Sequence, residues 1–186
     1  RTNDLLSFGQ DRIWRRQVLK TVNNKRAIEQ IHHERTFDFT FNGLPQVIDF
    51  KEDINSYYLI KKYCEGISLK EYWSKLKKRN RLTFLKNFMR EITPIFNYLL
   101  QHNIVHNDLK PSNFIIHEIH GVIKVSLIDF GLAIRKDDEI KRKTLFPLGF
   151  ASPELVLNQL NLVDQRSDIF AFGITIWNLH TNRLPF

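Results

Sequence analysis

His106-Asn107-Asp108-Leu109-Lys110-Pro111-Ser112-Asn113 is the stretch that decides the fold expected of this chain, together with Asp129-Phe130-Gly131, which begins 16 residues after Asn113. The first stretch lies between a long run of helical spacing and a short apolar strand, and the second closes the next strand. An aspartate, a lysine and an asparagine are therefore expected in one loop, beside a second aspartate from a neighbouring loop.

These side chains offer the groups that phosphoryl transfer requires. Asn113 and Asp129 present oxygen ligands, which Mg²⁺ prefers, and leave room for phosphate oxygens. The carboxylate of Asp108 can accept a hydroxyl proton, and Lys110 beside it can neutralise a migrating phosphoryl group. The sequence therefore predicts a magnesium-dependent phosphoryl-transfer site.

The two stretches resemble the catalytic loop H-R-D-L-x-x-x-N and the metal-binding D-F-G of eukaryotic-like serine/threonine protein kinases. Ser152-Pro153-Glu154 and then Asp168, which opens an apolar segment, follow in the order of that family. The resemblance covers about residues 18–186 and extends to kinase modules of large bacterial multidomain signalling proteins. It implies ATP and Mg²⁺ as cofactors and a protein substrate. It implies that Asp108 and Lys110 are catalytic and that Asn113 and Asp129 bind the metal. It also implies that Glu154 and Asp168 belong to the substrate platform.

The upstream half of the resemblance concerns nucleotide binding. Val18-Leu19-Lys20 stands where the family has a strand ending in V-A-I-K, which implies that Lys20 reaches the ATP phosphates. Glu34, nine residues before the turn at Gly43, is then the helix glutamate expected to accompany that lysine.

The segment from Lys61 to Gly66 is similar to the hinge that binds adenine through its backbone. By this alignment the backbones of Lys62 and Cys64 face the purine. Lys61 itself falls at a position behind the purine that the family normally fills with an apolar residue.

Several positions depart from the family pattern. No G-x-G-x-x-G precedes the strand lysine, and Gly9 is the only glycine there. Asn107 replaces the arginine that grips a phosphate on the activation loop, so control by loop phosphorylation is not expected. Pro147 is typical of tyrosine kinases, whereas Lys110 is the serine/threonine choice, so the acceptor hydroxyl stays open. Glu154 is expected to lack its usual partner, an arginine of a later helix.

The order of elements predicts an α+β, two-lobed, protein-kinase-like fold with a small β-rich N-lobe and a mainly helical C-lobe, both incomplete. The expected division is 1–62 for the N-lobe, 63–66 for the hinge and 67–186 for the C-lobe. Alternating or β-branched runs predict strands, and apolar residues at three- and four-residue spacing predict helices. The expected strands are 46–50, 57–60, 114–116 and 122–128, and the expected helices are 85–100, with Pro94 as a kink, and 169–179, apolar all round and therefore buried.

Composition narrows the class of protein. The 186 residues carry a formal charge of +8, with 42% hydrophobic and 12% aromatic residues, which excludes a disordered chain. The single cysteine, Cys64, excludes a disulfide scaffold and fits a reducing compartment, and no signal or membrane segment is seen, so a cytoplasmic protein is expected. The basic clusters within 75–81 and 135–143 favour a solvated or docking surface over nucleic acid.

Two other functions stay open beside the protein kinase. A catalytically weak pseudokinase gains weight from the missing glycine loop, and a small-molecule kinase of the aminoglycoside or choline type shares H-x-D-x-x-x-x-N.

His117 and His120 flank a hairpin and are interpreted as exposed turn residues, since no further ligand lies at metal-binding spacing. The chain starts at Arg1 without a methionine and stops at Phe186 after an apolar segment, so further domains of a longer chain are expected.

Overall fold

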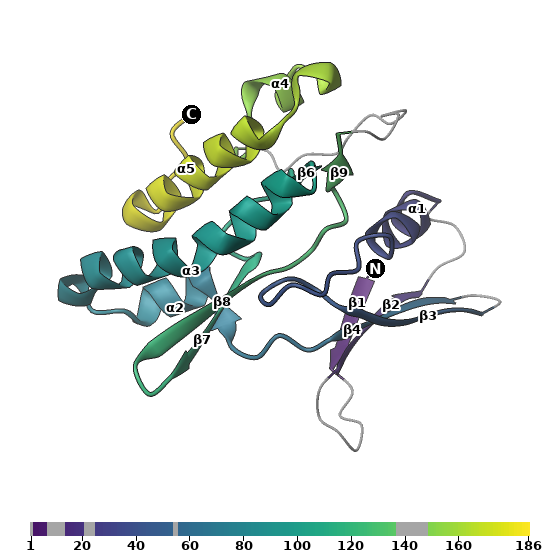
Figure 1. Cartoon of the computed structure of the whole chain (residues 1–186), viewed down its shortest axis with the longest axis horizontal. Coiled ribbons are helices and arrows are strands. Elements are labelled where there is room, and N and C mark those ends of the chain that lie inside the picture. The colour runs from purple at the N-terminus through teal and green to yellow at the C-terminus, as the bar shows by residue number, and fades with distance from the viewer. Residues whose placement is uncertain (1, 7–13, 21–24, 54–55, 137–148) are drawn as a thin grey trace.

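The computed structural model describes residues 2–6, 14–20, 25–53, 56–136 and 149–186, and before residue 28 and at residues 53 and 56 it describes the backbone alone. Strands form a sheet in the N-terminal part of the chain, and long helices dominate the C-terminal part (Figure 1). A single connection along the chain joins the two parts. The predicted α+β architecture is thus confirmed.

The N-terminal sheet has the order β1-β2-β4-β3, and each neighbouring pair is antiparallel. The strands predicted from the apolar runs at 46–50 and 57–60 are present as β3 and β4. The elements of this part are β1 (Thr2–Leu6), β2 (Trp14–Lys20), α1 (Lys25–Glu34), β3 (Val47–Asp53) and β4 (Ser56–Lys62).

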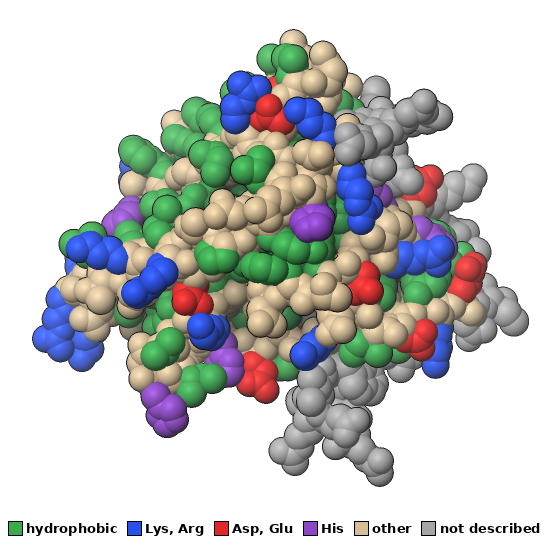
Figure 2. All heavy atoms as spheres, in the orientation of Figure 1, with side chains coloured by type: hydrophobic (Ala, Val, Ile, Leu, Met, Phe, Trp, Pro, Cys, Tyr) green, Lys and Arg blue, Asp and Glu red, His purple; other side chains and the backbone are tan. Residues whose placement is uncertain are grey.

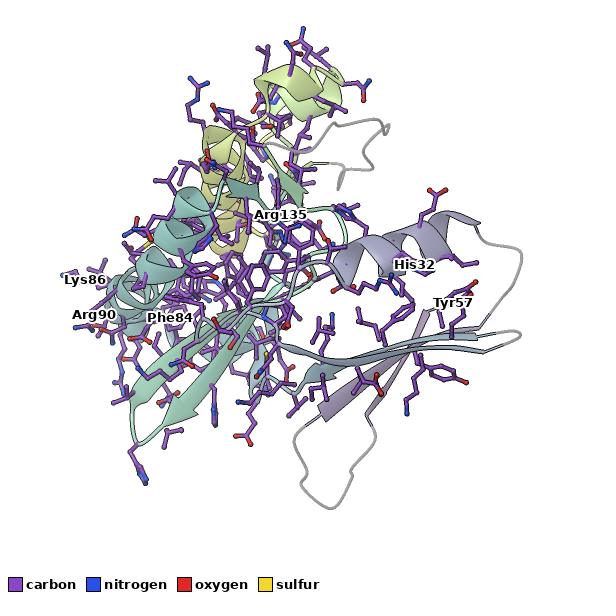
Figure 3. All side chains as sticks on the ribbon, turned by 45° about the vertical axis from the view of Figure 1, so that its right-hand side comes forward. His32, Tyr57, Phe84, Lys86, Arg90 and Arg135 are labelled. Carbon is purple, nitrogen blue, oxygen red and sulfur yellow. The ribbon has the colours of Figure 1, made fainter. Side chains whose placement is uncertain are left out.

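Helix α1 packs on this sheet through aromatic and aliphatic contacts. The ring of His32 lies 5.2 Å from that of Phe50 and 5.4 Å from that of Tyr57, measured between centroids. Figure 3 shows His32 on α1 facing Tyr57 on the sheet. Ile31 and Leu59 form the buried centre of this contact. The helix is thereby held so that its last residue, Glu34, is turned into the interior.

The C-terminal part contains the helices and two small sheets, of order β5-β7-β8 and β6-β9. Its elements are β5 (Ile67–Ser68), α2 (Leu69–Lys75), η1 (Lys78–Asn80), α3 (Arg81–Gln101), β6 (Ile104–Val105), β7 (Phe114–Ile119), β8 (Val122–Leu127), β9 (Ile134–Arg135), α4 (Pro153–Val156), η2 (Leu160–Leu162) and α5 (Gln165–Thr181). The hairpin expected from the alternating pattern is present as β7 and β8. Helix α3 continues through Pro94 without a break in the assigned helix.

The main core forms around one face of α3. Its buried side chains recur at three- and four-residue spacing, as an amphipathic helix requires. They are Phe84, Phe88, Ile92, Ile95 and Leu99. The ring of Phe88 packs on Phe114 of β7 and on Phe172 of α5, with centroids 5.6 and 6.0 Å away. This core carries the loops of the site on its edge.

Helix α5 is not buried all round, and that expectation is wrong. Ala171, Phe172 and Ile174 are buried, but Ile169 is 58% exposed and Trp177 is 51% exposed. One face of the helix packs on the core, and Ile169 and Trp177 lie on the other, exposed face. Hydrophobic side chains accordingly gather over α4 and α5 on the face seen in Figure 2.

Candidate active site

The loop of residues 106–113 is anchored from below by Asp168 at the start of α5. Its carboxylate accepts the backbone N–H of His106 at 2.7 Å and that of Asn107 at 3.0 Å. Burial raises the pKa of Asp168 to about 7, although both N–H donors act in the opposite direction. The backbone of Asn107 has a φ of 62°, and these two hydrogen bonds hold it in that left-handed conformation.

His106 joins this loop to the second loop. Its Nδ1 accepts the N–H of Asp108 at 3.2 Å, so Nε2 carries the proton and donates to the carbonyl of Ile128 at 3.1 Å. Burial lowers the pKa of His106 to about 4, and the ring is neutral at ordinary pH. The ring also lies 4.5 Å from that of Phe130, between centroids.

Phe130 completes a column of rings that runs between the two parts of the chain. Its side chain is 1% exposed, and its centroid lies 4.7 Å from that of Phe39 and 5.9 Å from that of Phe37. Both of these residues follow α1 in sequence, while His106 belongs to the loop below. The column places the preceding residue, Asp129, at the boundary between the two parts.

The carboxylate of Asp108 is held by two neighbours in its own loop. Lys110 donates to its two oxygens at 3.0 and 2.7 Å, and the amide Nδ2 of Asn113 donates to Oδ2 at 2.8 Å. Burial raises the pKa of Asp108, and the ammonium of Lys110 opposes that rise. The carboxylate is therefore fixed in place beside a cation, which is an arrangement that can accept a proton from an incoming hydroxyl.

Asn113 and Asp129 fit the oxygen chemistry of Mg²⁺. The amide nitrogen of Asn113 donates to Asp108, and its oxygen accepts the hydroxyl of Ser112 at 3.3 Å, at the lining of the cavity. Asp129 has a φ of 69°, and its half-exposed carboxylate faces the same cavity. Within the described part of the chain no group of three acidic, histidine or cysteine residues could hold a metal ion alone. One amide oxygen and one carboxylate suit Mg²⁺ that is also bound by phosphates.

The cavity lies between the sheet and the helical part and has a volume of about 450 Å³. Asn113 and Asp129 line it on one side and Lys62 and Cys64 on the other. The backbone N–H of Lys62 donates to the carbonyl of Gln46 at 2.9 Å, so this donor is engaged within the sheet region. The four predicted nucleotide and metal residues thus share one cavity.

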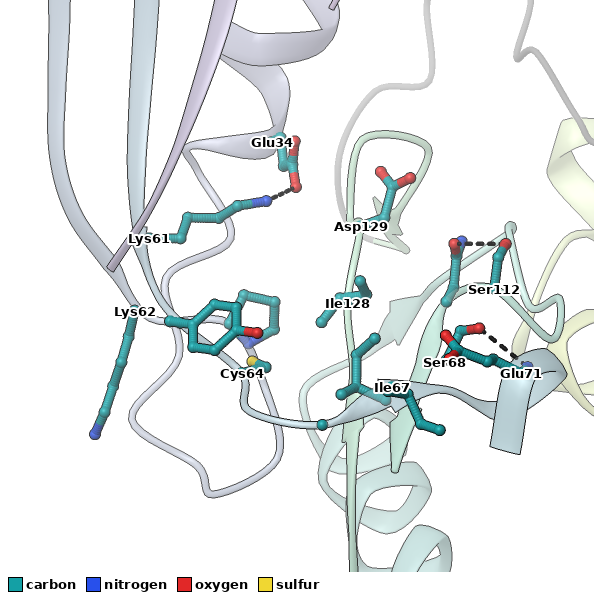
Figure 4. A pocket seen from close by; sticks show the side chains of 15 residues that line it. Glu34, Lys61, Lys62, Cys64, Ile67, Ser68, Glu71, Ser112, Ile128 and Asp129 are labelled. Carbon is teal, nitrogen blue, oxygen red and sulfur yellow. Dashed lines mark hydrogen bonds and ion pairs between the residues drawn. The ribbon is translucent and has the colours of Figure 1, made fainter. Parts of the chain in front are cut away.

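Glu34 lies at the inner wall of this cavity and is paired with Lys61. The Nζ of Lys61 lies 2.5 Å from Oε1 of Glu34, and both side chains are largely buried (Figure 4). Burial raises the pKa of Glu34, while Lys61 and a hydrogen bond from the backbone of Phe130 lower it. Sequence reasoning missed this role of Lys61, although its polar side chain at a normally apolar position was a usable signal.

The contact expected between Lys20 and Glu34 stays a prediction. The pairing of β2 with β4 places Lys20 opposite Ser56, at the other end of β4 from Lys61. The positions of Ser56 and Lys61 are five residue steps apart along β4, or about 16 Å. The side chain of Lys20 lies outside the described part of the structure.

Glu154 has a partner that the sequence did not indicate. The hydroxyl of Ser167, at the start of α5, donates to its carboxylate. Burial raises the pKa of Glu154, but hydrogen bonds from Ser167 and from its own backbone hold it below the ordinary value. Pro147 lies outside the described residues.

The histidines of the hairpin stay apart from the site. His120 is exposed in the turn between β7 and β8, and the ring of His117 lies 3.5 Å from the carboxylate of Glu65. In the described residues no helix combines the length and the hydropathy that a membrane crossing demands.

Comparisons with known proteins agree with this geometry. The family model described as the protein kinase domain matches residues 12–186. The chain is 32% identical over 171 residues to calcium-dependent protein kinase 6 of Plasmodium berghei, covering 90% of this chain and 11% of that protein. It is 35% identical over 147 residues to the serine/threonine-protein kinase PrkC of Bacillus subtilis, covering 77% and 22%.

The chain is also 31% identical over 155 residues to serine/threonine-protein kinase B of Synechocystis, covering 76% of this chain and 26% of that protein. It thus spans only about a tenth to a quarter of the length of these curated relatives. Proteins of this family generally use ATP and Mg²⁺. The match over residues 12–186 and the α+β arrangement of its elements show that the chain belongs to the protein kinase domain family.

Proposed function

We propose that this chain is the catalytic domain of an ATP-dependent protein kinase that transfers the γ-phosphoryl group to a serine or threonine hydroxyl. One observation carries the proposal. The carboxylate of Asp108 is fixed by Lys110 and Asn113, and Asn113 and Asp129 line the same cavity, opposite Lys62 and Cys64. The names of the relatives and the presence of Lys110 support serine or threonine as the acceptor.

Each residue of the loop has a distinct part in the proposed reaction. Asp108 orients the acceptor hydroxyl and takes its proton, and Lys110 offsets the negative charge of the group in transit. Asn113 and Asp129 hold Mg²⁺, which when bound neutralises charge on the phosphates. Asn113 also keeps the carboxylate of Asp108 in place through its amide nitrogen.

The remaining predicted residues bind nucleotide or support the protein substrate. Lys62 and Cys64 line the cavity, where their backbones would face the purine, and Glu34 lies beside Lys61. Glu154 and Asp168 support the platform on which a peptide lies, through Ser167 and the backbone of residues 106 and 107. We also propose that residues 63–66 form the hinge between the two lobes. The proposal further includes additional domains in a longer chain and a cytoplasmic location.

A phosphoryl-transfer assay tests the proposal. The full-length protein is incubated with Mg²⁺ and ATP labelled in the γ-phosphate, with a generic protein substrate, and the labelled amino acids are identified after hydrolysis. We expect phosphoserine or phosphothreonine, and a loss of turnover of about 10²–10⁴-fold in Asp108→Asn. Label on small molecules alone would favour the small-molecule kinase, and nucleotide binding without transfer would favour the pseudokinase.

A further inference from the structure

We infer that Lys61, near the end of β4, is the lysine that contacts the nucleotide phosphates, in the place that the sequence motif gives to Lys20. The inference rests on the proposed kinase function. By this inference Lys61, which lies in the strand before the hinge, belongs to the nucleotide-binding site.

The ammonium of Lys61 is held by the carboxylate next to the metal-binding loop. Glu34 accepts it at 2.5 Å and also accepts the backbone N–H of Phe130, the residue after Asp129. A buried carboxylate that binds both groups fixes the distance between them. Figure 4 shows Lys61 reaching to Glu34 on the wall of the cavity that faces Asp129.

The charge balance of the cavity favours a phosphate ligand for Lys61. The described residues that line it include the carboxylates of Glu34, Glu71 and Asp129, and a nucleoside triphosphate adds several further negative charges. Lys62 is the neighbouring ammonium, but its side chain points away from Glu34 and Asp129 (Figure 4). Lys61 carries three N–H donors and shares the cavity wall, so its ammonium can bind Glu34 and a phosphate oxygen together.

The register of the sheet places Lys20 away from this cavity. It lies opposite Ser56, and β4 enters the cavity lining at its other end, with Lys61 and Lys62. The two positions on β4 lie about 16 Å apart along the strand. Among the described side chains, the ammonium that pairs with Glu34 comes from β4.

A covalent probe identifies the lysine near the phosphates. The probe is an acyl phosphate of ATP, whose acyl carbon is attacked by the amine of a nearby lysine. An amide bond forms and the bond from the acyl carbon to the phosphate oxygen breaks. ATP leaves, and the amine gives its proton to water. The full-length protein is treated with this probe, with and without excess ATP, and the modified peptides are mapped by mass spectrometry. We expect label on Lys61 that excess ATP suppresses.

Matched variants supply a second measurement. Lys61→Met is expected to weaken Mg·ATP binding by about 10- to 100-fold in calorimetry, the range for the loss of one hydrogen bond to a charged group. Lys51→Met, an exposed lysine of β3 outside the cavity, is expected to bind Mg·ATP within twofold of the wild type. Lys61→Met with Glu34→Gln removes the unpaired buried charge, so the measurement is still possible if the single variant unfolds.

The outcomes separate the inference from the proposed function. Label on Lys20 with Lys61 unmodified, or equal Mg·ATP affinity of the wild type and both Lys61→Met proteins, overturns the inference and leaves the kinase proposal intact. A wild-type protein that binds no ATP and gains no ATP-protected label contradicts the kinase proposal and the inference with it.

Discussion

The carboxylate of Asp168 accepts the backbone N–H of His106 across a sequence separation of 62 residues, at 2.7 Å and in a fully buried position. Its second oxygen accepts the N–H of Asn107. A helix start and the loop that carries Asp108 are thus joined by one side chain. The loop depends on Asp168 for its backbone conformation.

Asp168→Asn is expected to lower the stability of the fold, because an amide offers one acceptor oxygen to two buried N–H donors. One unpaired donor costs about 1–3 kcal/mol, measurable by urea unfolding at pH 8, where the carboxyl group is ionised. Glu29→Gln, which changes an exposed carboxylate of α1, is the control and is expected to stay within about 0.5 kcal/mol of the wild type. Equal stability of the two variants would show that the loop does not need this anchor.

The stability difference between wild type and Asp168→Asn is expected to depend on pH. Burial raises the pKa of Asp168 to about 7 in the folded protein, above the ordinary value of 3.8. The folded state therefore holds a proton that the unfolded chain has released, and the wild-type free energy of unfolding falls as pH rises from about 4 to 7. The advantage of the wild type over the variant should shrink between pH 5 and pH 8. A constant difference would place the folded pKa outside this interval.

Asp129→Ala is expected to abolish Mg²⁺-dependent ATP binding, whereas Asn113→Ala should only weaken it, because a full negative charge binds the ion more strongly than an amide dipole. Asn113→Ala should also reduce turnover, since Asp108 loses the hydrogen bond from the amide nitrogen. Calorimetry with Mg·ATP measures the binding, and Asn97→Ala, an exposed residue of α3, is the control. Equal Mg·ATP affinity for wild type and Asp129→Ala would rule out this ligand assignment.

Ser167→Ala is expected to destabilise the protein by about 1 kcal/mol, the usual size of a lost helix cap. Its hydroxyl donates to Glu154 and accepts the N–H of Asp164 in the capping box of α5. Ser74→Ala, which removes an exposed hydroxyl bonded to the carbonyl of Glu71, is the matched control. Thermal unfolding of both variants measures the difference, and an equal loss would show that the link to Glu154 contributes nothing.

Gly66→Ala is expected to be more harmful than Gly121→Ala, although both glycines have positive φ, of 123° and 79°. A Cβ at residue 66 would lie 2.3 Å from the carbonyl oxygen of Ile116, whereas at residue 121 it would meet no atom within 4 Å. The clash should add about 1–3 kcal/mol to the loss of stability. Urea unfolding of the two variants checks this, and equal losses would mean that the backbone near Ile116 yields freely.

Motif spacing predicted the local part of the site because its residues lie close in the chain. Asp108, Lys110 and Asn113 fall within one short loop, so their contacts follow from local geometry. The spacing of apolar residues likewise indicated α3 and β8. A helix or strand that is buried on one face has apolar residues at the period of that element.

The pairing of Glu34 could not be predicted in the same way. It depends on how α1 packs on β4, which is set by contacts between residues 27 apart in the sequence. The motif at Lys20 describes one strand and contains no information on its partner. The periodicity of the segment that forms α5 could not indicate its exposed face for a related reason, because an all-apolar helix shows no period that marks the covered side.

The column of rings around Phe130 affects how often the carboxylate of Asp129 turns away from the cavity. Turning Asp129 away from the cavity by rotating its backbone would carry the neighbouring ring out from between Phe39 and His106. Exposing a buried phenylalanine costs about 2–3 kcal/mol, which corresponds to a ratio of about 30 to 150 between the two conformers. At any instant only a few molecules in a hundred, at most, would have the metal-binding carboxylate turned away. A ligand or partner that stabilises the turned-away conformer would have to supply this free energy through its own contacts.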